Sequence, residues 1–303
     1  MIKFIAERHH HTFTDAQGVS IHYYLWKAGR PRGVVQIAHG LGEYAMRYEE
    51  LAQELVNAGF TVYADDHRGH GQTGLGQHAG DRSLLGRLGP GGMRATIAGV
   101  RQLTGIIRDE NPALPVVLLG HSWGSIIAQK IINDHSEDYD ALVLSGTALR
   151  TVRRMKGKNL NAKHAHLGRT GYEWLSRDDT VALLFLDDEL TFTADAMALF
   201  GVVDSLRLLG LPARRLTADI PLLIQVGSDD PFGGARSAEL LARAYLGRSR
   251  LTDVQLTIYS GARHEVYQET NRAEVIADLL TWLDDRIRYP APQQVGDEAS
   301  DPR

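Results

Sequence analysis

The chain of 303 residues contains no cysteine. This absence excludes disulfides, thiolate metal ligands and a cysteine nucleophile, and it is compatible with any redox environment. No apolar run approaches the ~18 residues that a membrane-spanning helix needs. The first residues, MIKFIAERHHH, have neither a usable hydrophobic segment nor a small-residue cleavage site. We therefore expect a cytoplasmic protein without a transmembrane segment.

The chain also lacks an excess of positive charge. Its 33 Lys and Arg are outnumbered by 37 Asp and Glu, which gives a net charge of -4, so we expect no nucleic-acid partner. Residues 149–170 are a local exception, with basic side chains and no acidic one. These cations are Arg150, Arg153, Arg154, Lys156, Lys158, Lys163 and Arg169. A solvated loop is the simplest explanation, and transient contact with anionic lipid head groups is the alternative.

Short apolar runs rich in β-branched residues alternate with amphipathic stretches. The runs mostly lack polar–apolar alternation, which indicates strands buried on both faces. They lie at 33–38, 60–65, 115–119, 141–145, 221–227 and 254–260, and the helical patterns lie at 48–59, 93–110, 125–135, 236–247 and 272–287. Before them, FIAERHHHTFT and VSIHYYLW, joined by DAQG, predict a hairpin. The alternation predicts an α/β fold with a mostly parallel central sheet flanked by helices.

This alternation is interrupted once along the chain. Residues 147–218 contain no strand-like run and their pattern is helical, so we expect an inserted helical cap. The core would then consist of residues 1–146 and 219–288. The polar, proline-bearing tail, 289–303, is expected to be disordered.

The segment PVVLLGHSWGSIIAQ predicts a strand, a sharp turn and a helix, with Ser122 between Gly120 and Gly124. This is the G-x-S-x-G pattern of a nucleophile elbow. A serine in such a turn adopts a strained backbone conformation that lifts its hydroxyl above the sheet. Bulky side chains two residues away would collide with the strand and the helix. The pattern therefore predicts that Ser122 is a nucleophile.

A nucleophilic serine needs a general base and an orienting carboxylate, which in this fold follow it in the order acid, histidine. His264 comes after the strand-like run 254–260 and is the one histidine beyond residue 230. Asp229 and Asp230 both follow the run 221–227, and the local pattern leaves the choice between them open.

Two backbone N–H groups are candidates for an oxyanion hole. They belong to Leu41, in the loop IAHGLGEY, and to Trp123, which follows the serine. We assign no metal ligand: His9, His10 and His11 alternate between the faces of a strand, and His67 and His70 lie in a glycine-rich loop. Asp66 precedes the serine, so we expect it to anchor that loop.

Taken in this order, the motifs resemble those of the α/β-hydrolases of the monoacylglycerol lipase, lysophospholipase and serine aminopeptidase group. The resemblance covers about residues 15–288 and rests on HGLGEYAMRY, DDHRGHGQT, GHSWG, VGSDDP and GARHEVYQETNR. It implies an α/β-hydrolase fold with a cap and no cofactor. The family's acid ends a G-S-x-D motif, which implies Asp230 as the triad acid.

We therefore expect a serine hydrolase that cleaves carboxylic esters through an acyl-enzyme. The resemblance implies a glycerolipid with one acyl chain, a monoacylglycerol or a lysophospholipid. Phe185 and Phe200 are candidates for lining an acyl tunnel, although apolar helical stripes more often pack a cap onto its core.

Two alternatives to an esterase are open. The first is a serine aminopeptidase that holds the α-amino group of a small peptide on acidic residues of the cap. These are Asp178, Asp179, Asp187, Asp188 and Glu189. The second is a ligand-binding protein of the hydrolase fold without turnover, which the complete set of triad residues disfavours.

Overall fold

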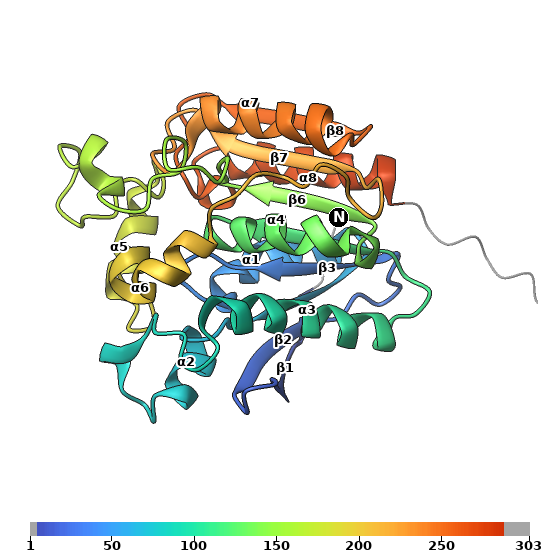
Figure 1. The fold of residues 1–303 in the computed structure, drawn as a ribbon, viewed down its shortest axis with the longest axis horizontal. Helices are drawn as coiled ribbons and strands as arrows, with labels where there is room; N and C mark the ends of the chain where they lie inside the picture. The colour runs from blue at the N-terminus through green and yellow to red at the C-terminus, as the bar shows by residue number, and fades with distance from the viewer. Residues whose placement is uncertain (1–4, 288–303) are drawn as a thin grey trace, which may run out of the picture.

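The computed structural model describes residues 5–287, and its eight strands form a single sheet (Figure 1). The strands are β1 (Arg8–Thr14), β2 (Ser20–Trp26), β3 (Gly33–Ala38), β4 (Phe60–Asp65), β5 (Val116–His121), β6 (Ala141–Ser145), β7 (Leu222–Gly227) and β8 (Val254–Tyr259). Their order in space is β1-β2-β4-β3-β5-β6-β7-β8. β1 and β2 form the expected antiparallel hairpin, β2 is antiparallel to β4, and the other pairs are parallel. The predicted α/β fold with a mostly parallel sheet is confirmed.

The inner strands are apolar throughout because each has two buried faces. Every residue of β3, β4, β5, β6 and β7 is buried. Successive side chains of a strand point to opposite faces. In β5, Val116 and Leu118 therefore belong to one hydrophobic core, and Val117 and Leu119 belong to the other.

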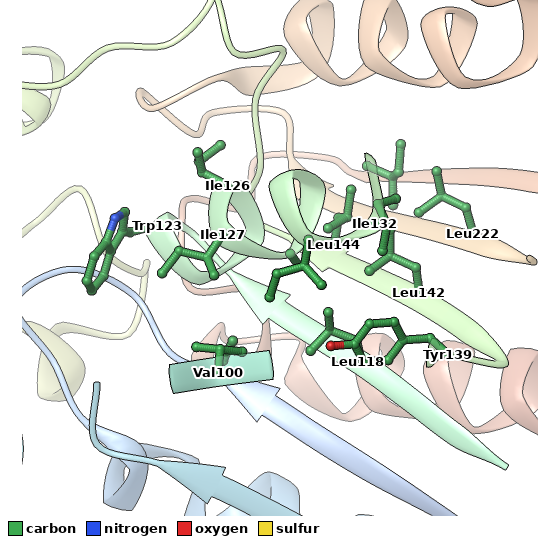
Figure 2. Packing of buried hydrophobic residues seen from close by; sticks show 14 of the residues in the cluster. Val100, Leu118, Trp123, Ile126, Ile127, Ile132, Tyr139, Leu142, Leu144 and Leu222 are labelled. Carbon is green, nitrogen blue, oxygen red and sulfur yellow. The ribbon is translucent and has the colours of Figure 1, made fainter. Parts of the chain in front are cut away.

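Helices cover both faces of the sheet. They are α1 (Glu49–Asn57), α2 (Gly71–Gln77), α3 (Gly92–Glu110), α4 (Trp123–His135), α5 (Asp179–Asp187), α6 (Ala196–Arg207), α7 (Gly234–Ala244) and α8 (Arg272–Arg286). Side chains of α1 and α8 fill one core, and those of α3, α4 and α7 fill the other. Figure 2 shows this second core, where Ile127 and Ile132 of α4 lie beside Leu118, Leu142 and Leu144 of the sheet.

The short helix α2 was not predicted from the sequence. Its seven residues, GQTGLGQ, contain three glycines, and glycine disfavours a helix interior by about 1 kcal/mol relative to alanine. Tertiary contacts override that preference here. A Cβ on Gly74 would lie 2.5 Å from the carbonyl carbon of Gly69, so the close packing of this turn requires glycine.

The chain between β6 and β7 contains no strand and carries α5 and α6. Both helices lie beyond the carboxyl ends of the parallel strands (Figure 1). α6 is interrupted at Gly201, whose φ of 71° and ψ of 178° are not helical. The tail 289–303, predicted to be disordered, lies outside the described residues. Within residues 5–287, no helix combines the length and the apolar character needed to cross a bilayer.

Arg150 fastens the segment between β6 and β7 to the core. The residue is 1% exposed. The guanidinium donates to the side-chain oxygen of Gln129 at 3.1 Å and to the carbonyl oxygens of Leu208, Leu209 and Leu211 at 3.2 to 3.4 Å. The sequence pattern predicted a solvated loop for residues 149–170. For Arg150 this prediction is wrong, because the carbonyl oxygens just after α6 need an internal donor.

Replacing Arg150 by methionine should lower the free energy of unfolding by about 2–4 kcal/mol, because several buried oxygens would lose a charged donor. Urea unfolding of the two proteins measures the difference. The control Arg153→Met removes an exposed arginine from the same segment and should change stability by less than ~0.5 kcal/mol. Equal losses in the two variants would contradict the anchoring role of Arg150.

Candidate active site

Ser122 lies in the turn between β5 and α4, with φ of 51° and ψ of -119°. A non-glycine residue at positive φ is strained by about 1–3 kcal/mol, and such strain clusters at functional sites. A Cβ on Gly120 would lie 2.6 Å from the carbonyl oxygen of Gly124, and a Cβ on Gly124 would lie 2.0 Å from that of Ala38. The two glycines are therefore needed for the close approach of β5, α4 and β3 around the serine.

His264 follows β8, and its Nδ1 is 3.0 Å from Oδ1 of Asp230, which follows β7. Asp230 is held in turn by the backbone N–H of Phe232, at 2.8 Å. Burial by itself lowers the pKa of His264, but the Asp230 carboxylate more than offsets this effect, so that the pKa is raised. Nε2 of His264 is buried and has no partner among the described residues. It is therefore free to accept a proton.

Asp229 points elsewhere, which distinguishes two residues that the local pattern left equivalent. Its carboxylate pairs with Lys163 and lies 2.8 Å from Nε2 of His164. Both partners belong to the segment between β6 and β7. Asp229 thus fastens that segment to the core, whereas Asp230 contacts His264.

The two candidate oxyanion-hole N–H groups lie beside Ser122: that of Trp123 directly follows it, and that of Leu41 belongs to the loop after β3. Within residues 5–287, neither the Leu41 nor the Trp123 N–H has a hydrogen-bond acceptor, and both residues line the same cavity as Ser122. The carbonyl of Gly40, in the same peptide unit as the Leu41 N–H, lies 2.7 Å from Nδ1 of His39. Because Nε2 of His39 accepts from the N–H of His67 at 3.0 Å, Nδ1 carries the proton and fixes the orientation of this peptide.

Gly42 allows this loop to pass under the segment that carries α5 and α6. Its φ is 84°, and a Cβ here would lie 2.3 Å from the carbonyl oxygen of Phe192. The N–H of Phe192 donates to the carbonyl of Gly42 at 3.0 Å. One strand-like contact thus joins the loop of Leu41 directly to that segment.

Ser122 and His264 line one cavity of about 60 Å³. Its wall is mainly apolar and comes from both the core and the segment between β6 and β7. The apolar members are Leu41, Trp123, Ile126, Met155, Leu160, Tyr172, Trp174, Leu175, Phe185, Ala194, Ala196, Leu208 and Phe232. Phe185 is therefore at the cavity wall, whereas Phe200 does not line the cavity and contacts one of its lining residues, with its ring 5.3 Å from that of Trp123.

Asp66 anchors a loop, as its chain position suggested. Its carboxylate accepts from the N–H of Ala45 at 3.0 Å and of Gln72 at 2.8 Å, and from the hydroxyl of Tyr24 at 3.3 Å. Burial raises the pKa of Asp66 to about 7. The residue lines no part of the cavity around Ser122, so it is not a candidate triad acid.

A buried ionic group that was not predicted from the sequence lies beside the cavity and consists of Glu43, Arg47 and Glu265. A signal for it was present. Two of these residues lie within HGLGEYAMRY and the third directly follows His264.

Comparison with known proteins identifies the family. The model described as serine aminopeptidase, S33, matches residues 29–271. The chain is 32% identical over 289 residues to the monoacylglycerol lipase of Mycolicibacterium smegmatis, covering 91% of this chain and 97% of that protein. It is 29% identical over 291 residues to the monoglyceride lipase of Mus musculus, covering 90% and 89%.

A solved structure has the same fold as this chain. A thermostable carboxyl esterase from Bacillus coagulans superposes with a TM-score of 0.77 at 23% identity, covering 93% of this chain and 99% of that one. This likeness shows the α/β-hydrolase fold. The resemblance found in the motifs is confirmed: the chain belongs to the serine aminopeptidase (S33) family of α/β-hydrolases and is a carboxylic ester hydrolase of the monoacylglycerol lipase type.

Proposed function

We propose that Ser122, His264 and Asp230 form the catalytic triad of this ester hydrolase. The observation that carries the proposal is the shared cavity of a strained Ser122 and a His264 bonded to Asp230 through Nδ1. Ser122 Oγ attacks the ester carbonyl carbon, and its proton passes to Nε2 of His264. Collapse of the tetrahedral intermediate expels the alcohol, which receives that proton. Water then cleaves the acyl-enzyme by the same steps.

The backbone N–H groups of Leu41 and Trp123 are proposed to bind the oxyanion. Both lack an acceptor among residues 5–287, and the Trp123 N–H also begins α4, whose N-terminal dipole favours negative charge. Donors that are already oriented stabilise the charge that develops during attack without reorganisation.

The substrate is proposed to be a glycerolipid with one acyl chain, a monoacylglycerol or a lysophospholipid. The mainly apolar wall suits an alkyl chain, and the relatives named above are monoacylglycerol lipases. Ligand pockets usually measure about 300–1,000 Å³, far more than the 60 Å³ here. Residues 147–218 would therefore act as a cap that shifts to admit the acyl chain.

Catalytic efficiency should rise with acyl-chain length across p-nitrophenyl esters from acetate to medium chains. Each buried methylene contributes about 0.8 kcal/mol, so kcat/KM should climb at least several-fold until the cavity is full. Phe185→Ser should flatten that climb, because Phe185 lines the cavity. Phe200→Ser should flatten it less, because Phe200 does not line the cavity and only contacts Trp123, which does.

The ratio of rates for two chain lengths is independent of the amount of folded enzyme, so a loss of stability in either variant does not disturb it. A steep profile retained in Phe185→Ser would contradict the acyl-binding role. A preference of the wild type for acetate esters would contradict a lipid substrate while leaving the triad in place.

The aminopeptidase alternative has less support. None of the five acidic cap residues Asp178, Asp179, Asp187, Asp188 and Glu189 lines the cavity around Ser122. Asp178 caps α5 by accepting from the N–H of Thr180, Asp188 accepts from Tyr44, and Glu189 pairs with Arg82. Aminoacyl anilides assayed beside the esters test this alternative directly, and faster cleavage of the anilides would favour it.

The cap is also proposed to contact lipid surfaces transiently. Among residues 5–287, twelve large apolar side chains are exposed, and ten of them lie between β6 and β7. Seven belong to α5 and α6: Leu183, Leu184, Leu186, Met197, Val202, Val203 and Leu206. Exposed basic residues of the same segment, Arg153, Arg154, Lys156 and Lys158 among them, would add attraction to anionic head groups.

The wild type should sediment with vesicles of phosphatidylcholine and phosphatidylglycerol, and the double variant Leu184→Ser/Val203→Ser should sediment several-fold less. The matched control Leu246→Ser removes an exposed leucine after α7 and should bind as the wild type does. Equal binding by all three proteins would contradict docking through the cap. The cytoplasmic location expected from the sequence stays a prediction.

A further inference from the structure

A buried guanidinium lies between two carboxylates that belong to different parts of the site. Nη2 of Arg47 is 2.9 and 2.7 Å from the two carboxylate oxygens of Glu265, and Nε is 3.2 Å from Oε2 of Glu43. All three side chains are less than a tenth exposed. Removing such charges from water costs several kcal/mol per ion, so a buried ion pair is weak evidence for stabilisation. The buried group of Glu43, Arg47 and Glu265 is therefore better explained by a role in the site than by stabilisation of the fold.

Glu43 holds the loop that carries the Leu41 N–H. Its Oε1 accepts from the N–H of Gly40 at 2.5 Å and from the hydroxyl of Tyr48 at 2.7 Å. A side chain on Gly40 would occupy this place, since its Cβ would lie 2.6 Å from the same oxygen. The carboxylate thus fixes the turn immediately before Leu41, and Arg47 fixes the carboxylate.

Glu265 holds the turn that carries the triad base. It directly follows His264, and its N–H donates to the carbonyl of Leu175 at 2.8 Å. The guanidinium of Arg47 also lies over the ring of Phe185, 4.8 Å from its centroid. One side chain therefore contacts the oxyanion-hole loop through Glu43, the histidine turn through Glu265 and the cavity wall through Phe185.

We propose that Arg47 is a positioning residue that couples the oxyanion hole to the triad base. By pairing with Glu43 and Glu265 together, it keeps the Leu41 N–H and the imidazole of His264 at a constant separation. Glu43 and Glu265 line the cavity of Ser122 and Arg47 does not, so Arg47 acts through its two partners. The inference rests on the proposed roles of Ser122, His264 and Leu41.

The test compares Arg47→Met with Arg47→Lys and with a matched control. Arg47→Met keeps an unbranched apolar side chain and removes the bridge. It should lower kcat for p-nitrophenyl butyrate by about 10²–10³-fold, the usual cost of losing one oxyanion-hole donor, with KM changed by less than ~3-fold. Arg47→Lys keeps the charge and should recover part of kcat. A trifluoromethyl ketone, which forms an oxyanion when Ser122 adds to it, should lose affinity in proportion to kcat.

The control is Arg32→Met, which removes an arginine that is 8% exposed in its side chain and pairs with Asp284. Arg32 directly precedes β3, at the opposite end of that strand from the loop of Leu41. This variant should lose stability but keep kcat and the affinity for the trifluoromethyl ketone.

Two results would overturn the coupling role: a kcat in Arg47→Met no lower than in Arg32→Met when both are folded, or an unchanged affinity for the trifluoromethyl ketone. Labelling of the wild type by a fluorophosphonate separates this failure from a wrong triad. If Ser122 is labelled and Arg47→Met keeps its kcat, the bridge alone is refuted. If Ser122 is not labelled, the proposed function fails as well.

Discussion

Replacing Ser122 by alanine should lower kcat for esters by about 10⁶-fold while leaving the fold intact. The loss is large because the hydroxyl forms the covalent bond, and no other side chain can substitute for it. The backbone cost is small, since alanine tolerates a φ of 51° about as well as serine does. Ester hydrolysis, fluorophosphonate labelling with peptide mapping, and circular dichroism measure the three parts of this result.

The matched control is Ser237→Ala, which removes a buried hydroxyl from α7 that donates to the carbonyl of Arg154. It should cost stability and retain labelling at Ser122. Labelling of the wild type at any other serine, or full esterase activity in Ser122→Ala, would dispose of the mechanism.

Asp230→Asn should lower kcat by about 10⁴-fold, and Asp229→Asn by less than ~10-fold. Asparagine at 230 can donate to Nδ1 of His264, which favours the tautomer with its proton on Nε2, and that nitrogen can then no longer accept the serine proton. Asp229 instead contacts Lys163 and His164. Asparagine at 229 should therefore weaken the attachment of the cap to the core and leave the imidazole of His264 unaffected.

Parallel assays of the two variants with one ester decide whether Asp229 or Asp230 is the triad acid, because the residues are adjacent and the substitutions are chemically identical. A larger penalty at position 229 would make Asp229 the acid and would mean that the 3.0 Å contact between Asp230 and His264 is not the one used in catalysis.

Features that depend on neighbouring residues could be predicted from the sequence. The strands were found because a strand buried on both faces must be apolar along its whole length, as β3 and β7 are. The turn at Ser122 was found because the elbow requires glycine at 120 and 124, where a Cβ would meet backbone. Burial and backbone conformation both restrict which residue types occur within a few positions of the chain, so a local pattern indicates them.

Features that depend on distant partners could not be predicted in this way. Asp229 and Asp230 share one turn, and only the packing of β7 beside β8 aims Asp230 at a histidine 34 positions away. In the sequence, Arg150 has the same pattern as the exposed cations around it. Its burial depends on the carbonyls of Leu208 and Leu211, about 60 residues away, which accept its hydrogen bonds. Phe185 and Phe200 both lie in apolar helical stretches of the sequence, yet α5 places Phe185 at the cavity wall, whereas Phe200 of α6 contacts Trp123 without lining the cavity.

By itself, the sequence determined the fold class of this protein and singled out Ser122 and His264 as the proposed nucleophile and base, because each depends on local patterns of burial, glycine and chain order. The tertiary structure decided which aspartate contacts His264, which apolar side chains of residues 147–218 line the cavity, and the contact of Arg47 with Glu265 across 218 residues. Such contacts form through the packing of whole helices and strands against one another, and the residues next to a side chain in the sequence do not determine that packing.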